Sequence, residues 1–299
     1  MTMMVTAVLV TFNRSKILKR ALDELLATNV TNVVVVNNAS TDDTARVLAS
    51  YSDLRLHVTH LETNLGGAGG FAYGINEAVS KYETDYVWLM DDDTIVNNDA
   101  LTELEKIAYK LDNQFGFLAS LVMWDSKPVE VAKMNLPWLM KDWAGKISDN
   151  LIEVMNATFV SLFVPAKLVR EKGLPISEFF IWSDDTEYTD RLTHDLPGYL
   201  VLSSVVTHAI QNNEKVNIVT EVGGRIERYY YSYRNRLYIA KQKGLTQVAR
   251  EIIRTTYFGF KVIGGHDELG TKLKKIKVMV KGTFAGLSFK PKVKWVNGH

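Results

Sequence analysis

The chain has 299 residues, of which 46% are hydrophobic and 23% are charged, so it can bury the core of a large α/β domain with an appendage. Its 35 basic and 34 acidic residues leave a net charge of +1, which gives no reason to expect a nucleic-acid partner. The lack of cysteine excludes disulfides and Cys-ligated zinc or iron–sulfur sites, and it fits a reducing cytoplasm.

The first half of the chain alternates short apolar runs with amphipathic segments. It starts without the basic region and long apolar stretch of a secretory signal, and no later segment has the length of a transmembrane helix. Val5–Val10 is typical of a buried strand, and a helix with one apolar face starts at Ser15. The alternation predicts an α/β fold, a mostly parallel sheet with helices on both faces. Further strands are expected over residues 33–36, 56–61, 86–90 and 117–123, and further helices start near residues 40, 71 and 98.

The second half of the chain is less regular. Residues 124–150 form a polar, tryptophan-bearing excursion, which predicts a flap or hairpin. We divide the chain into an α/β domain over residues 1–225 and a helical, basic region over residues 226–299. Strands are expected over residues 156–165 and 199–206, and helices from residue 186, over 229–243 and over 247–263.

Polar residues follow four of the strands expected in the first half. Ligands of such sheets bind at the carboxyl ends of the strands, so these side chains should converge on one crevice. That convergence indicates a site better than any single motif does. The residues at these strand ends are Thr11, Phe12, Asn13, Arg14, Asn37, Asn38, Asn64 and the run Asp91-Asp92-Asp93.

Asp91 and Asp93 stand one residue apart on a loop just past a buried strand. Two carboxylates in that arrangement can hold one hard divalent cation, which offsets the charge of a nucleotide-sugar diphosphate and of its leaving group. We therefore expect a hard divalent cation at Asp91 and Asp93, with Asp92 facing the ribose or the sugar. The alternative is a solvated acidic turn that caps the next helix.

A second acidic cluster follows the aromatic segment 179–182 and contains Asp184, Asp185 and Glu187. An inverting glycosyl transfer needs a base for the proton of the acceptor hydroxyl, and a carboxylate at this position suits that task. Capping of the following helix is the alternative. His208, just after the strand over 199–206, can complete the shell of a cation with a neutral imidazole or can be a structural residue.

Three further motifs are less specific. The glycine-rich turn from Gly66 to Gly70 permits close approach to a phosphate, but it is neither a Walker loop nor a dinucleotide fingerprint. Arg234, in a tyrosine-rich helix, can hold a diphosphate or an acceptor, or can pack on the core. Residues 272–294 carry eight lysines and no acidic residue among apolar side chains, which fits an anionic membrane surface or a solvated helix.

Six short motifs occur between residues 5 and 240. They are VTFNR (10–14), VVNNASTD (35–42), NLGGAGGF (64–71), DDDT (91–94), FIWSDDTEY (180–188) and YRN (233–235). Together and in this order they resemble the family 2 glycosyltransferases of the GT-A (Rossmann-like) fold. The likeness is strongest to the galactofuranosyltransferase and rhamnosyltransferase branches.

The resemblance implies an inverting transfer by a single displacement, with Asp185 as the base. It implies that Asp91, Asp93 and His208 hold Mn²⁺ or Mg²⁺. The acceptor would lie near Trp182, Asp184 and Glu187. The candidate donor-binding residues are Thr11, Phe12, Asn13, Arg14, Asn37, Asn38, Asn64, Gly66, Gly69, Asp92 and Arg234.

Three features depart from the family pattern. Many relatives have Asp where Asn37 or Asn38 stands, so the contact with uracil or ribose would differ there. Ser183 stands where relatives have a second aromatic residue, which would alter stacking of the acceptor. The chain is also shorter than the polymerising galactofuranosyltransferases, so addition of one or a few sugars is expected.

We therefore predict a metal-dependent hexosyltransferase that moves galactofuranose from UDP-galactofuranose to a cell-surface or exopolysaccharide glycan on a lipid carrier. The expected location is the cytoplasm, with peripheral contact at the inner face of the cell membrane through the lysine-rich C-terminus, and an oligomer is compatible with the sequence. The alternatives are a rhamnosyltransferase that uses dTDP-rhamnose and a non-catalytic nucleotide-binding scaffold of an assembly complex. A nucleotidyltransferase would need a glycine- and lysine-rich first loop, which residues 11–16 do not supply.

Overall fold

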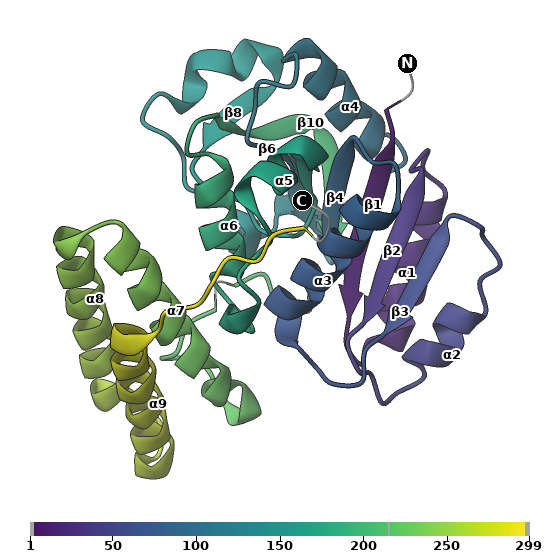
Figure 1. Cartoon of the computed structure of the whole chain (residues 1–299). Coiled ribbons are helices and arrows are strands. Elements are labelled where there is room, and N and C mark those ends of the chain that lie inside the picture. The colour runs from purple at the N-terminus through teal and green to yellow at the C-terminus, as the bar shows by residue number, and fades with distance from the viewer. Residues whose placement is uncertain (1–2, 215, 297–299) are drawn as a thin grey trace. The chain divides into compact units, whose positions relative to one another are not determined.

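The computed structural model describes residues 3–214 and 216–296 (Figure 1). The chain divides into two compact units. An α/β unit comprises the described parts of residues 1–177, 185–214 and 293–299, and a helical unit comprises those of residues 178–184 and 215–292. The helical unit thus includes segments before residue 226, where the sequence analysis placed the division.

Short apolar and β-branched runs form the strands of the α/β unit, because such side chains pack well on a sheet that is covered on both faces. The expected strand over residues 33–36 is confirmed, and its four valines are fully buried. The strands are β1 (Val5–Thr11), β2 (Asn32–Asn37), β3 (Leu56–His60), β4 (Tyr86–Asp91), β5 (Thr94–Val96), β6 (Phe117–Trp124), β7 (Lys127–Val131), β8 (Leu151–Val154), β9 (Leu162–Pro165) and β10 (Gly198–His208).

These strands form one sheet, in which the order of the main path is β3-β2-β1-β4-β9-β6-β10-β5. The first four strands of this path are parallel to one another, as the sequence predicts. The second half of the sheet is mixed: β6 and β10 pair in parallel, whereas β9, β8, β7 and β5 are added as antiparallel strands.

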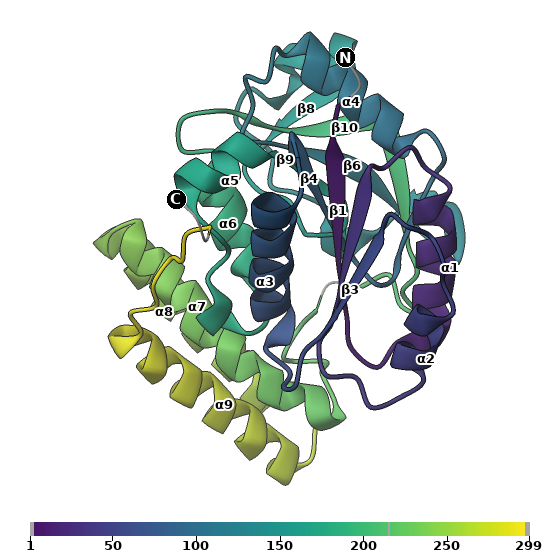
Figure 2. The same cartoon turned by 45° about the vertical axis from the view of Figure 1, so that its right-hand side comes forward.

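Helices cover both faces of this sheet (Figure 2). Alternate residues of β1 point to opposite faces, so Leu9 joins the core beneath α1 and α4, and Val8 joins the core beneath α3, α5 and α6. The apolar faces expected for α1 and α4 are confirmed by their buried leucines. The helices of this unit are α1 (Ser15–Leu26), α2 (Thr44–Ala49), α3 (Gly66–Lys81), α4 (Ala100–Lys110), α5 (Ala166–Lys172) and α6 (Asp184–Leu192).

The glycine-rich segment is helical in the structure, which corrects the expectation of a turn. Helix α3 begins at Gly66, five residues before the expected start at Phe71. A Cβ atom on Gly70 would lie 2.5 Å from Cγ1 of Val10, and one on Gly74 would lie 2.5 Å from Cγ1 of Val8. The glycines therefore let α3 lie directly on β1. Sequence propensity disfavours glycine in helices, but close packing on the sheet outweighs it here.

Several strands differ from the expectation, and β8 is one that was not expected. The strand expected over residues 156–165 is limited to β9, because the buried Ser161 adopts a φ of 72°, which no regular strand allows. The Ser161 hydroxyl accepts a hydrogen bond from the Trp88 indole at 2.9 Å. The short strand β5, which directly follows Asp93, was not expected at all.

The helical unit contains α7 (Tyr229–Gln242), α8 (Leu245–Gly264) and α9 (Leu269–Ser288). Tyr229, Tyr233, Val262 and Met279 belong to its small apolar core. Gly282 lets α9 approach α7 closely, because a Cβ atom there would lie 2.5 Å from a backbone oxygen of α7. None of the described helices combines the length and the hydropathy that a membrane crossing requires.

Replacing Gly74 with alanine should destabilise the α/β unit by about 1–3 kcal/mol, because the new methyl group would have to displace Val8 and Val36. The free energy of unfolding can be measured in urea by far-ultraviolet circular dichroism. Gly67→Ala is the matched control in the same helix, since nothing lies within 4 Å of a Cβ atom there. An equal loss in both variants would contradict the packing role of Gly74.

Candidate active site

The acidic run at the end of β4 is tied to the neighbouring strand β1. The two strands are parallel, with Asp91 opposite Val10. Oδ2 of Asp92 accepts hydrogen bonds from the Thr11 hydroxyl at 2.7 Å and from the Phe12 amide at 3.3 Å. Burial and the adjacent Asp93 raise the pKa of Asp92 to about 7, against these hydrogen bonds. Asp92 therefore fastens the loop after β1, whereas the sequence analysis expected it to face the ribose or the sugar.

The strand β5 brings Asp93 and His208 together. It pairs antiparallel with β10, so that Thr94 lies opposite His208, and the Ala209 amide donates to the Asp93 carbonyl at 2.9 Å. Among the described residues, one ligand atom each of Asp91, Asp93 and His208 lies within 4.8 Å of the others. The three metal ligands named from the sequence therefore meet at one place.

The imidazole of His208 is oriented by Asn135. Nδ1 of His208 lies 2.8 Å from Oδ1 of Asn135, and Nδ2 of Asn135 donates to the Thr158 hydroxyl at 2.8 Å. Because an amide oxygen only accepts hydrogen bonds, Nδ1 carries the ring proton, and the lone pair of a neutral ring is at Nε2. Sequence reasoning missed Asn135, since only the folded chain brings it beside His208.

The lone pair of His208 faces a carboxylate. Its Nε2 lies 3.1 Å from Oδ1 of Asp93, and both side chains are buried. Two electron-rich atoms at this distance need a cation to hold them together, either a ring proton or a metal ion. Burial opposes ionisation of Asp93, but a ring proton on Nε2 of His208, together with Arg14, outweighs burial and lowers the pKa of this carboxyl. One imidazole and two carboxylates thus fit a divalent cation.

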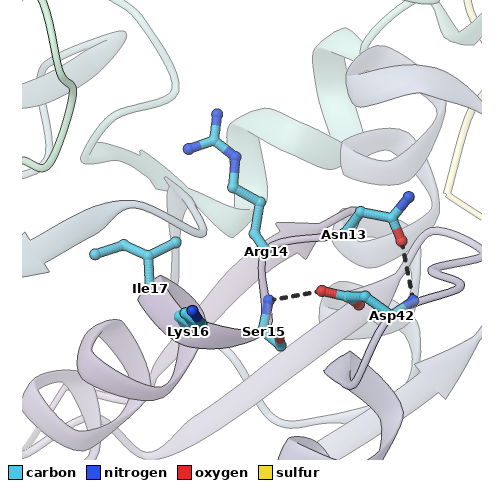
Figure 3. Close-up of a pocket in the computed structure, with 6 residues that line it drawn as sticks. All are labelled: Asn13, Arg14, Ser15, Lys16, Ile17 and Asp42. Carbon is cyan, nitrogen blue, oxygen red and sulfur yellow. Dashed lines mark hydrogen bonds between the residues drawn. The ribbon is translucent and has the colours of Figure 1, made fainter.

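Arg14 adds positive charge beside the acidic run. Its Nη1 atom donates to Oδ2 of Asp93 at 2.8 Å, and about half of its side chain is exposed. Arg14 and Lys16 line an open hollow of about 350 Å³ together with Asn13, Ser15 and Asp42. Figure 3 shows the Arg14 side chain extending to the opposite side from Asn13 and Asp42. The hollow beside Asp93 therefore offers two cationic groups.

Hydrogen bonds across two loops shape this hollow (Figure 3). Oδ1 of Asn13 accepts from the amides of Thr41 and Asp42, at 2.7 and 3.3 Å. Oδ2 of Asp42 accepts from the Ser15 amide at 3.1 Å, so its charge lies at the N-terminus of α1. Desolvation opposes ionisation, but hydrogen bonds from Thr44 and Ser15 lower the pKa of Asp42 to about 2.

Asn37 and Asn38 are buried and hydrogen-bonded within the protein. Oδ1 of Asn38 accepts from the Leu65 amide at 2.8 Å, and its Nδ2 donates to the Gly66 carbonyl at 2.9 Å. Oδ1 of Asn37 accepts from the Ser40 amide at 3.1 Å. Asn64 in turn accepts from the Gly66 amide at 2.7 Å. These asparagines fix the loops after β2 and β3, so a contact with a donor would be additional to these bonds.

The second acidic cluster lies at the start of α6. Oδ1 of Asp185 accepts from the amide and the hydroxyl of Thr186, at 2.6 and 3.2 Å. Burial raises the pKa of Asp185 against these hydrogen bonds. Glu187 forms a bidentate ion pair with Arg191 one turn later, at 3.0 and 2.9 Å. Asp185 therefore takes up a proton more readily than an exposed aspartate would.

The residues before α6 have an unusual backbone. Phe180, Trp182 and Ser183 have positive φ values of 64°, 65° and 66°, which are costly for residues other than glycine. Within the helical unit, the amide of Asn235 donates to the carbonyls of Phe179 and Trp182, at 3.0 and 2.9 Å. The YRN motif of α7 thus holds the conformation of the FIWS segment, a link that the sequence did not reveal.

Arg234 has structural contacts in the helical unit. It is buried, it donates to the carbonyls of Glu178 and Phe179, and its guanidinium lies 3.9 Å from the ring centroid of Phe289. Burial lowers the pKa of Arg234. These contacts agree with the alternative that this helix packs on the core. None of them indicates that Arg234 binds a diphosphate.

Comparisons with known proteins agree with this geometry. Residues 6–134 match the model of the glycosyl transferase family 2. The galactofuranosyltransferase GlfT1 of Mycobacterium tuberculosis (strain CDC 1551 / Oshkosh) is 28% identical over 276 residues, which cover 86% of this chain and 89% of that protein. GlfT1 of Mycolicibacterium smegmatis is 27% identical over 267 residues, which cover 83% and 86%.

Solved structures with the same fold include TarS 1-349 of S. aureus. That structure has a TM-score of 0.51 and 17% sequence identity, and the match covers 94% of this chain and 72% of that one. Its complex with UDP matches with the same TM-score, at 18% identity. Residues 6–134 therefore match a family 2 glycosyltransferase domain, and the chain is a glycosyltransferase of the GT-A fold.

Proposed function

We propose that the chain transfers galactofuranose from UDP-galactofuranose to a hydroxyl group of a glycan, with inversion at the anomeric carbon. The relatives that match most of the chain are named galactofuranosyltransferases, which supports this donor. The opposition of Asp93 and His208, beside the two cationic groups of the hollow, supports a metal-dependent mechanism. The acceptor is proposed to be a lipid-linked glycan.

The metal site would consist of Asp91, Asp93 and His208. Carboxylate oxygens and one imidazole are suitable ligands for Mn²⁺ or Mg²⁺. When bound, the cation neutralises charge on the diphosphate and on the leaving nucleotide. Asn135 would keep Nε2 of His208 unprotonated, because its amide oxygen retains the ring proton at Nδ1.

The donor would bind along the loop after β1. Arg14 reaches the carboxylates of the metal site and is half exposed, so its guanidinium can pair with the diphosphate. Phe12 is the exposed aromatic residue of this loop, and its ring can stack on the base. Thr11 would contribute indirectly, because its hydroxyl donates a hydrogen bond to Asp92. The other donor candidates, which shape the neighbouring loops, are Asn13, Asn37, Asn38, Asn64, Gly66 and Gly69.

Asp185 would act as the base. The acceptor hydroxyl oxygen attacks the anomeric carbon, the bond from that carbon to the diphosphate breaks, and UDP leaves with the bonding electrons. The hydroxyl proton passes to the Asp185 carboxylate, whose raised pKa makes it a stronger base than an exposed aspartate. Trp182, Asp184 and Glu187 are proposed to bind the acceptor.

The donor can be tested with released nucleotide as the readout. We expect the protein, with Mn²⁺ and a galactofuranosyl acceptor, to release UDP from UDP-galactofuranose faster than it releases dTDP from dTDP-rhamnose. Omitting the acceptor controls for hydrolysis, and a chelator controls for the metal. Preferential release of dTDP would favour a rhamnosyltransferase, and no metal-dependent binding of UDP would favour a scaffold.

Asn135→Ala should weaken Mn²⁺ binding by about 10–100-fold although Asn135 is not a ligand, because His208 would lose the group that fixes its tautomer. The affinity can be measured by isothermal titration calorimetry without a donor. Asn135→Asp retains an acceptor for Nδ1 and should keep an affinity near that of the wild type. If alanine and aspartate have the same effect, Asn135 does not act through His208.

Asp185→Asn should lower kcat by about 10²–10⁴-fold while UDP binding stays unchanged, because the amide cannot accept the proton. Asp195→Asn, which removes an exposed carboxylate paired with Lys172, is the control. Turnover near the wild-type rate in Asp185→Asn would exclude Asp185 as the base.

The pH profile of the wild type provides a second readout for this residue. A base must be ionised, so kcat/KM should fall as the pH drops through its pKa. Because burial raises the pKa of Asp185, this fall should occur above the usual pKa of an aspartate, about 4. A fall at or below that value would contradict the assignment.

A further inference from the structure

The outer side of the α8–α9 hairpin is unusually apolar. Eight large apolar side chains on these two helices have exposed fractions between 48% and 70%, and six of them, three on each helix, recur at helical spacing. We call this surface the α8–α9 apolar face. It consists of Ile253, Tyr257 and Phe260 on α8 and of Leu273, Val280 and Phe284 on α9.

The two helices contribute to one continuous surface. They are joined by only four residues, and a Cβ atom on Gly259 of α8 would lie 3.8 Å from Met279 and 3.9 Å from Ile276 of α9. The opposite sides of both helices are covered by α7, since Gly282 faces Tyr230 and Glu251 forms an ion pair with Arg236. On the helical wheel of each helix, the apolar face lies away from these contacts with α7.

Basic residues flank the apolar face on both sides. Arg250, Arg254 and Lys261 are exposed along one edge of α8, and Lys277 and Lys281 are exposed along the outer edge of α9. The chain has no acidic residue from Leu269 onward.

Not all lysines of residues 272–294 are available to bind an anionic surface. Lys275 is fully buried and bonds to the Val219 carbonyl and to Asp267, so it belongs to the interior of the helical unit. Lys274 is paired with Glu227 at 3.0 Å. Apart from the half-buried Lys272, the positive charge available on α9 is therefore at Lys277 and Lys281, beside the apolar face.

We propose that the α8–α9 apolar face binds the surface of an anionic phospholipid bilayer. The two helices would lie in the plane of the interface, with the apolar side chains among the acyl chains and the basic flanks at the headgroups. A second copy of the chain is disfavoured as the occupant, because pairing two such faces would bring their basic flanks together. This inference does not depend on the donor or on the reaction.

The test is sedimentation of the full-length protein with vesicles, without nucleotide, metal or acceptor. We expect binding to vesicles of phosphatidylcholine and phosphatidylglycerol, weaker binding at high salt, and little binding to phosphatidylcholine alone. Phe260→Ser with Phe284→Ser should lower the partition coefficient by about a hundredfold or more. Lys277→Glu with Lys281→Glu should lower it by about thirtyfold or more.

The controls make equivalent changes elsewhere. Leu54→Ser with Tyr109→Ser removes two apolar side chains that are 94% and 82% exposed in the α/β unit. Lys141→Glu with Lys167→Glu makes the same change of net charge at exposed sites in that unit. Both control variants should bind vesicles like the wild type, and circular dichroism should show that all variants are folded.

Three results would overturn the proposal. One is a wild-type protein that does not bind anionic vesicles. Another is binding that the α8–α9 variants and the control variants change equally. The third is a stable oligomer that Phe260→Ser with Phe284→Ser dissociates while vesicle binding persists, because a second copy would then cover the face. If Phe260→Ser with Phe284→Ser does not fold, vesicle binding by Lys277→Glu with Lys281→Glu alone tests the proposal, since that variant changes only exposed side chains.

Discussion

The organisation of the candidate active site depends on two electron-rich atoms that lie close together, Oδ1 of Asp93 and Nε2 of His208. Such a contact between buried atoms is unfavourable unless a cation lies between them. Several elements of the fold nevertheless hold the two atoms in this position. The strand β5 positions Asp93 beside β10, Asn135 sets the imidazole, and Arg14 holds the other carboxylate oxygen. The surrounding strand and side chains therefore preorganise a place for positive charge.

The first half of the fold could be predicted because its signals are local. A parallel strand that is buried on both faces has a short apolar run as its sequence. A polar residue after such a run lies at the edge of the sheet where ligands bind. This is why β1, β2 and β4 and the grouping of Asp91 with Asp93 followed from the sequence. The role of His208 was predicted partly from the family resemblance, since the sequence around a single histidine does not distinguish a metal ligand from a structural residue.

The remaining features depend on contacts between distant parts of the chain. The glycines of α3 read as a turn, and only the proximity of β1 explains why they are helical. Asn135 acquires its role from a partner 73 residues away, and Asn235 from a segment more than 50 residues earlier. Lys275 is buried although Lys274 and Lys277 beside it in the sequence are partly or fully exposed. No local rule identifies such residues, because burial and pairing are properties of the folded chain.

Two motifs that looked independent in the sequence are coupled in the helical unit. The segment around Trp182 adopts left-handed backbone angles that its residues do not favour by themselves, and Asn235 offsets that cost by donating to its carbonyls. The backbone conformation of the proposed acceptor segment therefore depends on the YRN motif of α7. Changes in either motif should therefore be interpreted together.

The position of Asp92 has a consequence for reading mutational data on this acidic run. Three consecutive aspartates invite the view that each substitution tests the same ligand set. Yet Asp92 holds the Thr11 hydroxyl and the Phe12 amide, so its loss would release the loop that carries Arg14. An inactive Asp92 variant and an inactive Asp93 variant would then fail for different reasons, one by a displaced loop and one by a lost ligand. A scan that scores turnover alone would record them as equivalent, and only a probe of local order would separate them.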